Sequence, residues 1–284
     1  MTSNLDCFPC ILRHALNVAR MAHADESTRR AILAEAMDVL RRAEPTTSPS
    51  ALCTEMQRIV CRATHTRDPY RETKDRCTRL TLGLYPFMHG LVGASDDPLG
   101  IGVRVSAAGN AIDPAMPAGF DLKTVMQRLL THSFAIDQLP ALREAVAAAS
   151  RILFLADNAG ETVCDRVLIE ALHRPVDYAV KGGPVMDDAT HADAVAAGID
   201  DVATIVETGS DALGTILSQC AHGFRRRFAD APLIIAKGQA NFETLRGEDE
   251  RVFFLLHTKC AAIAEEIGTP VGSFVLMQGR PRAA

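Results

Sequence analysis

Through the first 90 residues, apolar side chains recur every three or four positions, which is the spacing of helices that bury one face. Ile11, Ala15 and Val18, for example, fall on the same side of the first segment. Helices are predicted over about residues 7–24, 28–42, 50–63 and, after a turn at 67–74, up to about residue 89. We therefore expect residues 1–95 to form an all-helical N-terminal region.

After residue 150, short runs of consecutive apolar residues alternate with helical patterns. Strands are predicted at 152–156, 176–180, 203–206, 233–236, 253–256 and 273–276. Helices are predicted at 122–130, 139–150, 161–173, 191–197, 213–228 and 260–267, whereas the small residues of 101–110 are interpreted as the approach to a turn. Strands that alternate with helices indicate a doubly wound, mainly parallel sheet. Residues 96–284 are therefore predicted to form an α/β domain.

Composition narrows the functional classes. The chain has 284 residues, of which 48% are hydrophobic, so it can bury a sizeable core. A formal net charge of −5 and the lack of a basic stripe argue against nucleic-acid binding. No apolar run reaches the roughly 18–20 residues of a membrane span, and no signal peptide is visible, so we expect a cytoplasmic protein. Eight irregularly spaced cysteines suggest reduced thiols, and the pattern does not indicate an oligomeric state.

The first predicted strand of this alternation is followed directly by polar residues. Asp157 and Asn158 end the strand, a small-residue turn follows, and a helix opens near Glu161. In open α/β sheets, ligands bind at the carboxyl ends of the strands. Carboxylate and amide oxygens suit a hard divalent cation, and the N–H groups of a helix start suit a phosphate. The pattern favours a metal-assisted phosphoryl site.

Three later strand ends also carry polar residues, at 187–188, 208–211 and 237–241. Any one of them is explained by ordinary turn and N-cap preferences. Together on one edge, they would supply oxygen ligands for Mg²⁺ or Mn²⁺ and a lysine, Lys237, for a phosphate. The chain contains no P-loop, no Gly-x-Gly-x-x-Gly after a strand and no Gly-x-Ser-x-Gly, which argues against P-loop NTPases, dinucleotide oxidoreductases and α/β-hydrolases.

The pair Cys7-x-x-Cys10 has two interpretations. It could pack structurally, or it could form an auxiliary metal or redox site that Cys260 joins through the fold. A regulatory module built on these thiols is therefore one alternative function. A carboxyl methyltransferase is another, although residues 157–161 make a poor adenosyl-binding loop.

Taken in order, several motifs resemble those of the damage-control phosphatase family, also known as domain of unknown function 89. They are residues 5–10 with Arg13, 68–70 with Lys74, 108–113, 157–161, 183–190, 237–243 and 259–260. The resemblance covers nearly the whole chain, and the N-terminal Cys-x-x-Cys is similar to the prokaryotic stand-alone members. It implies a Rossmann-like α/β sheet with an appended helical region.

The resemblance also implies an activity and a set of ligands. The implied enzyme is a metal-dependent phosphatase of small phosphorylated metabolites, such as a sugar phosphate or a phosphorylated or damaged cofactor, with Mg²⁺, Mn²⁺, Co²⁺ or Ni²⁺. Its metal ligands would be Asp157, Asn158 and Asp188. Lys237 would bind the phosphate. Position 187 is Asp where similar members often have Asn or Ser, which would tighten metal binding and repel phosphate.

Four more residues complete the predicted site. By resemblance, Asn110 and Asp113 would line it. From the residues themselves, the N–H groups of Gly160 and Glu161 would join Lys237 in stabilising charge on the transferring phosphoryl group. Either carboxylate of the metal set could orient the attacking water.

Overall fold

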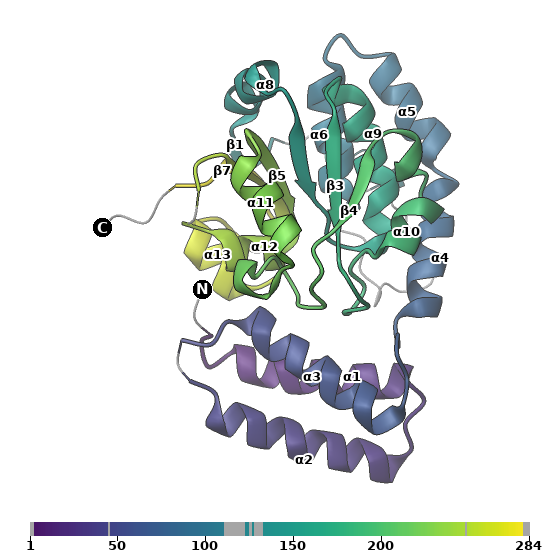
Figure 1. Ribbon diagram of the computed structural model, residues 1–284, viewed down its shortest axis with the longest axis vertical. Helices are drawn as coiled ribbons and strands as arrows, with labels where there is room; N and C mark the ends of the chain where they lie inside the picture. Colours follow the sequence, from purple (N-terminus) through teal and green to yellow (C-terminus); the bar gives the residue numbers. More distant parts are fainter. Residues whose placement is uncertain are drawn as a thin grey trace.

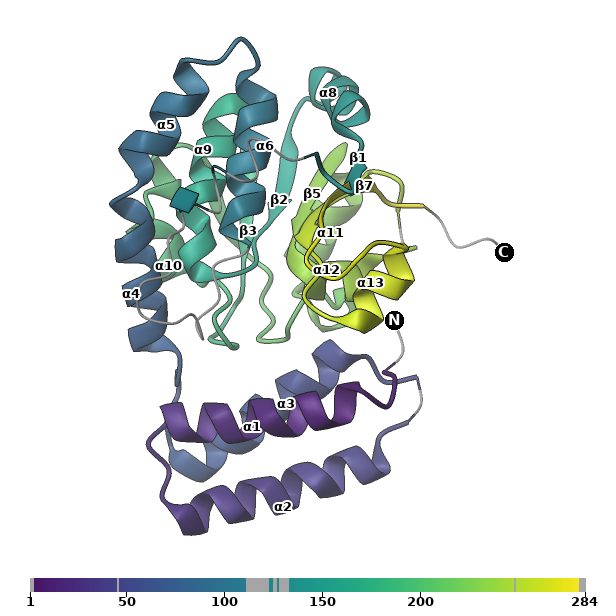
Figure 2. The same ribbon diagram turned by 180° about the vertical axis from the view of Figure 1, so that it is seen from behind.

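The computed structural model describes residues 3–44, 46–110, 123–124, 127, 133–247 and 249–280. Three helices form a separate layer below the rest of the molecule (Figure 1): α1 (Cys7–Met21), α2 (Glu26–Arg42) and α3 (Pro49–Thr64). Asp25 caps α2 by accepting from Thr28 N at 2.7 Å, and Ser48 caps α3. The apolar faces meet in a cluster of their own that includes Ile11, Ile32 and Met56. Helix α2 packs against α1 and α3 and lies farthest from the sheet (Figure 2).

Helices α4 (Arg71–Leu82), α5 (Tyr85–Gly93) and α6 (Pro98–Gly109) run along the α/β part of the molecule. The interpretation of residues 101–110 as the approach to a turn is wrong, because α6 occupies this stretch. Its small residues, among them Ser106 and Ala107, are buried and let α6 pack closely on α9 (Thr162–Leu172). This tertiary contact stabilises a helix that its own glycines disfavour. Met88 of α5 already belongs to the hydrophobic cluster of the sheet.

Seven strands form one sheet in the order β1-β7-β6-β5-β2-β3-β4. The strands are β1 (Ile136–Asp137), β2 (Ile152–Leu155), β3 (Val176–Val180), β4 (Thr204–Glu207), β5 (Leu233–Lys237), β6 (Val252–His257) and β7 (Phe274–Gln278). All neighbouring pairs are parallel except β6 and β7, which are antiparallel. The predicted α/β fold with a mainly parallel sheet is confirmed. The two-residue strand β1 was not expected from the pattern.

Helices cover both faces of this sheet. Alternate side chains of β2 point to opposite faces, so Phe154 packs with α5, α6, α8 and α9, whereas Leu153 packs with α11, α12 and α13. The α-helices not yet named are α8 (Leu139–Ala148), α10 (His191–Ala196), α11 (His222–Asp230), α12 (Gly238–Leu245) and α13 (Ala261–Ile267). Three short 3-10 helices are η1 (Ala159–Glu161), η2 (Ile199–Asp201) and η3 (Leu217–Gln219). The helix predicted at 213–228 starts only at His222, and α12 was missed. No helix in the described ranges is long and apolar enough to cross a membrane.

The direction of winding reverses at the neighbouring strands β2 and β5. From β2 the chain proceeds to β3 and β4 on one side, and from β5 to β6 on the other. The carboxyl ends at this reversal face the three-helix layer, and α3 lies nearest to them (Figures 1 and 2). Such a reversal is the usual binding position in a doubly wound sheet.

Candidate active site

The end of β2 and the loop after β3 are joined by main-chain hydrogen bonds. Ala189 N donates to Asp157 O at 2.8 Å, Ala159 N donates to Asp187 O at 2.7 Å, and Asn158 forms a bridge with Asp188. The loop thereby turns back toward β2 beside the β2–β5 reversal. Asp157, Asn158 and Asp188, which the sequence predicts as metal ligands, are brought together and are all buried.

The backbone at the start of α12 leaves room for the Asp157 carboxylate. Gly238 has a left-handed φ of +76°, and a Cβ at this position would overlap the carboxylate of Asp157. Only glycine meets both demands without strain. Residue 238 therefore lets the end of β5 approach the end of β2 closely.

Negative charge is concentrated at the predicted ligands. Burial, with Asp188 and Glu161 nearby, raises the pKa of Asp157 well above its usual value. Burial also raises the pKa of Asp188. The positive charges of Lys181, 3.3 Å from Asp188 Oδ2, and of Lys74 lower this pKa but do not outweigh burial. Two neighbouring buried carboxylates favour the binding of a cation.

The donor atoms also fit a hard divalent cation. Oδ2 of Asp188 is buried and accepts no hydrogen bond from the residues that the structure describes, since the approach of Lys181 is an ion pair only. Within those same residues, no three His, Cys, Asp or Glu side chains form a metal-binding group. The predicted set has two carboxylates and one amide, Asn158. These oxygen ligands match Mg²⁺ or Mn²⁺ in type.

Lys237 occupies a different place from the one predicted. Its ammonium is fully buried and donates to Ser106 O at 3.1 Å, to Asp165 Oδ1 at 2.6 Å and to Glu161 Oε1. Burial lowers the pKa of Lys237, but Asp165 and Glu161 outweigh it and raise the pKa above its usual value. All three N–H donors are used. Lys237 therefore lies beneath the site and has no donor left for a phosphate.

Glu161 and Asn110 also act through contacts that differ from the prediction. Glu161 N donates to Asn158 O, and its carboxylate accepts from the amides of Asn110 at 3.0 Å and Asn158 at 3.2 Å. Asn110 also donates to Asp157 Oδ2 at 2.9 Å and accepts from His257 N at 2.9 Å. Both residues hold the ligands in position. Their contacts give no sign of a direct role with phosphate.

Gly160 and Asp113 were also predicted to belong to the phosphate site. Gly160 lies in η1, where a Cβ would stand 2.7 Å from the Cβ of Cys77 in α4. This close contact explains the glycine independently of any ligand. Asp113 lies outside the described residues, as does most of the helix predicted at 122–130.

Two lysines near the carboxylates had no predicted role. The positive charge of Lys259, just after β6, lowers the pKa of Asp157, and its side chain is exposed. Lys181, directly after β3, is buried beside Asp188 and donates to Gly214 O. Both residues follow strands, so the rule that locates Asp157 could have found them. Lys259 is the better candidate for contact with a phosphate because its side chain is accessible.

The three-helix layer holds the loop that carries Asp188. Gln57 of α3 is buried, donates to Pro184 O at 3.4 Å and accepts from Met186 N at 2.6 Å. Met186 has a left-handed φ of 45° and packs against the helical cluster. A non-glycine residue in this conformation persists only where its surroundings hold it. The layer therefore takes part in building the site.

Replacing Gln57 with Leu is expected to weaken the site. The variant loses both part-buried hydrogen bonds to the loop, so the free energy of unfolding should fall by about 1–3 kcal/mol, the typical net contribution of two such bonds. The affinity for the activating metal should fall because Asp188 is held less firmly. Urea unfolding and a metal titration of activity check both effects. Gln57→Glu, which keeps the bond to Met186 N, should lose less metal affinity, and equal losses would contradict this role.

The cysteines singled out in the sequence are all free thiols. Burial raises the pKa of Cys7, and Cys260, Glu243 and Cys10 lie close enough to raise it further. The fold thus brings the three thiols into one neighbourhood, and their role as an auxiliary metal or redox site stays a prediction.

A sequence profile described as the damage-control phosphatase ARMT1-like domain matches residues 3–275. The chain belongs to this family. The family resemblance predicted from the motifs is thereby confirmed. Membership supports a phosphatase, a hydrolase, over the methyltransferase and the cysteine-based module.

Relatives match over the full length. The chain is 30% identical to the damage-control phosphatase PH1575 of Pyrococcus horikoshii, covering 99% of both proteins. It is 29% identical to a damage-control phosphatase of Archaeoglobus fulgidus, covering 95% of this chain and 96% of the relative. The crystal structure of PH1575, a DUF89 family protein, superposes with a TM-score of 0.88 over 99% of this chain and 100% of the other at 29% identity. The shared fold therefore includes the helical layer.

Proposed function

We propose that this protein is a metal-dependent phosphomonoesterase that hydrolyses a small phosphorylated metabolite. The proposal rests chiefly on the convergence of Asp157, Asn158 and Asp188 at the reversal between β2 and β5. The phosphatase names of the relatives support the same class of reaction. From the family resemblance, the expected substrate is a sugar phosphate or a phosphorylated or damaged cofactor.

The three ligands would hold one divalent cation, Mg²⁺, Mn²⁺, Co²⁺ or Ni²⁺. When bound, this ion supplies positive charge for the phosphoryl oxygens and lowers the pKa of a water. Asp157 or Asp188 would orient the attacking water and accept its proton. Lys259, which is exposed and whose positive charge acts on Asp157, would bind the phosphate.

The residues below the ligands would keep them in place. Lys237 anchors the carboxylate of Glu161, and Glu161 fixes the amides of Asn110 and Asn158. The Nδ2 group of Asn158 donates to the carboxylates of Asp157 and Glu161, so its side-chain oxygen Oδ1 is the atom that would bind the metal. This preorganisation means that little rearrangement is needed when substrate binds.

Activity is expected to depend on added metal. Protein freed of metal with EDTA should not hydrolyse p-nitrophenyl phosphate or members of a sugar-phosphate panel. At least one of Mg²⁺, Mn²⁺, Co²⁺ and Ni²⁺ should restore turnover by about a hundredfold or more, because the ion contributes several kcal/mol to the transition state. Phosphate release in the metal series measures this. Hydrolysis that is equal with and without metal, or absent with all four ions, would refute the proposal.

Metal analysis of two variants separates this site from the thiols. Asp157→Ala should abolish retention of the activating ion, whereas Cys7→Ser should leave it unchanged. The opposite pattern would favour the cysteine-based module.

A further inference from the structure

A cavity lies between α3 and the loops that follow β3 and β4. Its volume is about 420 Å³, which is large enough for a small metabolite or part of one. Its walls are mainly polar or made of glycine. They consist of Thr54, Gln57, Arg58, Cys61, Arg67, Gly182, Gly183, Pro184, Val185, Gly209 and Asp211. The proposed catalytic residues are not among them.

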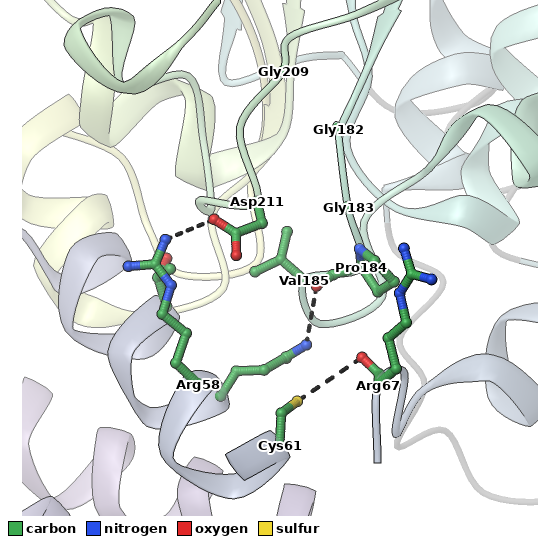
Figure 3. A pocket seen from close by; sticks show the side chains of 11 residues that line it. Arg58, Cys61, Arg67, Gly182, Gly183, Pro184, Val185, Gly209 and Asp211 are labelled. Atoms are coloured by element: carbon green, nitrogen blue, oxygen red, sulfur yellow. Dashed lines mark hydrogen bonds and ion pairs between the residues drawn. The ribbon is translucent and has the colours of Figure 1, made fainter. Parts of the chain in front are cut away.

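Two arginines provide positive charge on opposite sides of this cavity (Figure 3). Arg58 pairs with Asp211 at 2.6 Å and lies 3.8 Å from Glu55. Arg67 is exposed, and its guanidinium forms no hydrogen bond or ion pair with the residues whose positions are described. Within the described part of the chain the charge of Arg67 is thus unpaired, and its guanidinium could bind a small anion.

The glycine turns add main-chain donors. The N–H groups of Gly183, Gly209 and Asp211 have no acceptor in the described part of the chain. A Cβ on Gly182 would stand only 2.7 Å from Gly209 Cα, so the two turns touch and present their backbones closely. Exposed N–H groups in such turns are a common means of binding anions.

One loop connects the cavity with the predicted metal ligands. At the base of this loop, Lys181 and Thr190 form a β-bridge, and Gly182 N donates to Ser210 O in the neighbouring loop. Asp188, farther along the same loop, forms a β-bridge with Asn158. The same loop therefore carries both cavity-lining residues and Asp188, and Asp188 N donates to the lining residue Val185 O at 3.1 Å.

We propose that this cavity binds a second anionic group, a carboxylate or a phosphate, of the molecule whose phosphoryl group is hydrolysed at Asp157 and Asp188. The inference rests on the proposed function and narrows it to phosphorylated metabolites with an acidic group at the far end. Arg67 is the principal ligand of that group, and the N–H groups of Gly183 and Gly209 assist it. Asp211 weakens the binding of that acidic group because it neutralises the charge of Arg58.

The test uses two substrates that differ at one carbon atom. In 6-phosphogluconate this carbon is a carboxylate, and in sorbitol 6-phosphate it is an alcohol. With the activating metal, kcat/KM should favour 6-phosphogluconate by about tenfold or more, the factor expected for one charge-assisted hydrogen bond. Arg67→Gln should reduce this ratio to near one, and Asp211→Asn should increase it. Arg41→Gln, on the outer helix α2, is the matched control and should preserve the ratio.

The ratio distinguishes a binding role from a structural one, because a general disturbance lowers both rates together. An unchanged ratio in Arg67→Gln, or no preference in the natural protein, would overturn the inference while leaving the proposed function intact. If neither compound is hydrolysed with any metal, metal-dependent hydrolysis of p-nitrophenyl phosphate and the sugar-phosphate panel decides the proposed function. Calorimetric binding of both compounds to metal-free protein then decides the inference: tighter binding of 6-phosphogluconate that depends on Arg67 supports the anion site, and equal binding overturns it.

Discussion

Replacing Asp157 with Asn should abolish metal-dependent phosphatase activity while leaving the protein folded. Loss of residues that merely support a metal ligand usually costs ten- to a hundredfold in metal affinity or activity, so loss of a ligand should cost about a hundredfold or more. Asn is isosteric, so the space beside Gly238 stays filled. Initial rates at saturating metal and substrate measure the effect.

Thermal unfolding separates loss of the metal from loss of the fold. Without metal, Asp157→Asn should melt at the same temperature as the natural protein or higher, because it removes one of two neighbouring buried carboxylates. The natural protein should gain stability when metal is added, and the variant should not. Asp200→Asn, at an exposed position in η2, is the control that should keep both activity and the metal-induced gain. Retained activity in Asp157→Asn would exclude Asp157 as a ligand.

Lys237→Met should have the largest effect on stability. The substitution removes the only cation within hydrogen-bonding distance of Glu161 and Asp165 among the residues described, and leaves two buried carboxylates uncompensated. Breaking a buried ion pair in this way typically costs about 3–5 kcal/mol. Urea unfolding at neutral pH gives the free energy of unfolding directly.

A compensated variant tests the cause of that loss. Lys237→Met combined with Glu161→Gln and Asp165→Asn removes the two negative charges as well, so it should be more stable than Lys237→Met alone. Its activity should remain low, because Glu161 no longer fixes the amide of Asn158 as firmly. Charge pairing would not be the contribution of Lys237 if Lys237→Met lowered the free energy of unfolding by less than about 1 kcal/mol. The same conclusion would follow if the triple variant were no more stable than Lys237→Met.

Local pattern was sufficient for much of the fold. The strand at Val176–Val180 was predicted with its observed limits, and the strands at β2, β5 and β6 within a residue or two. These strands are buried on both faces, so apart from Asp177 of β3 they consist of consecutive apolar residues that end at polar ones. The same change of residue type located Asp157, whereas Asp188 lies farther along the loop after β3 and was identified as a ligand by the family resemblance. Helix α6 was missed because its glycines and small side chains are stabilised by packing on α9, which a local pattern does not contain.

By itself, then, the sequence determined that this is an α/β protein with oxygen-rich strand ends and a family resemblance that the comparison confirmed. Only the tertiary structure decided what each polar side chain contacts. Lys237 and Lys259 both follow strands, yet one is buried among carboxylates and the other is exposed beside Asp157. Which of them can meet a phosphate depends on partners far away in the chain, such as Ser106 and Asp165, and no spacing along the sequence specifies those distances.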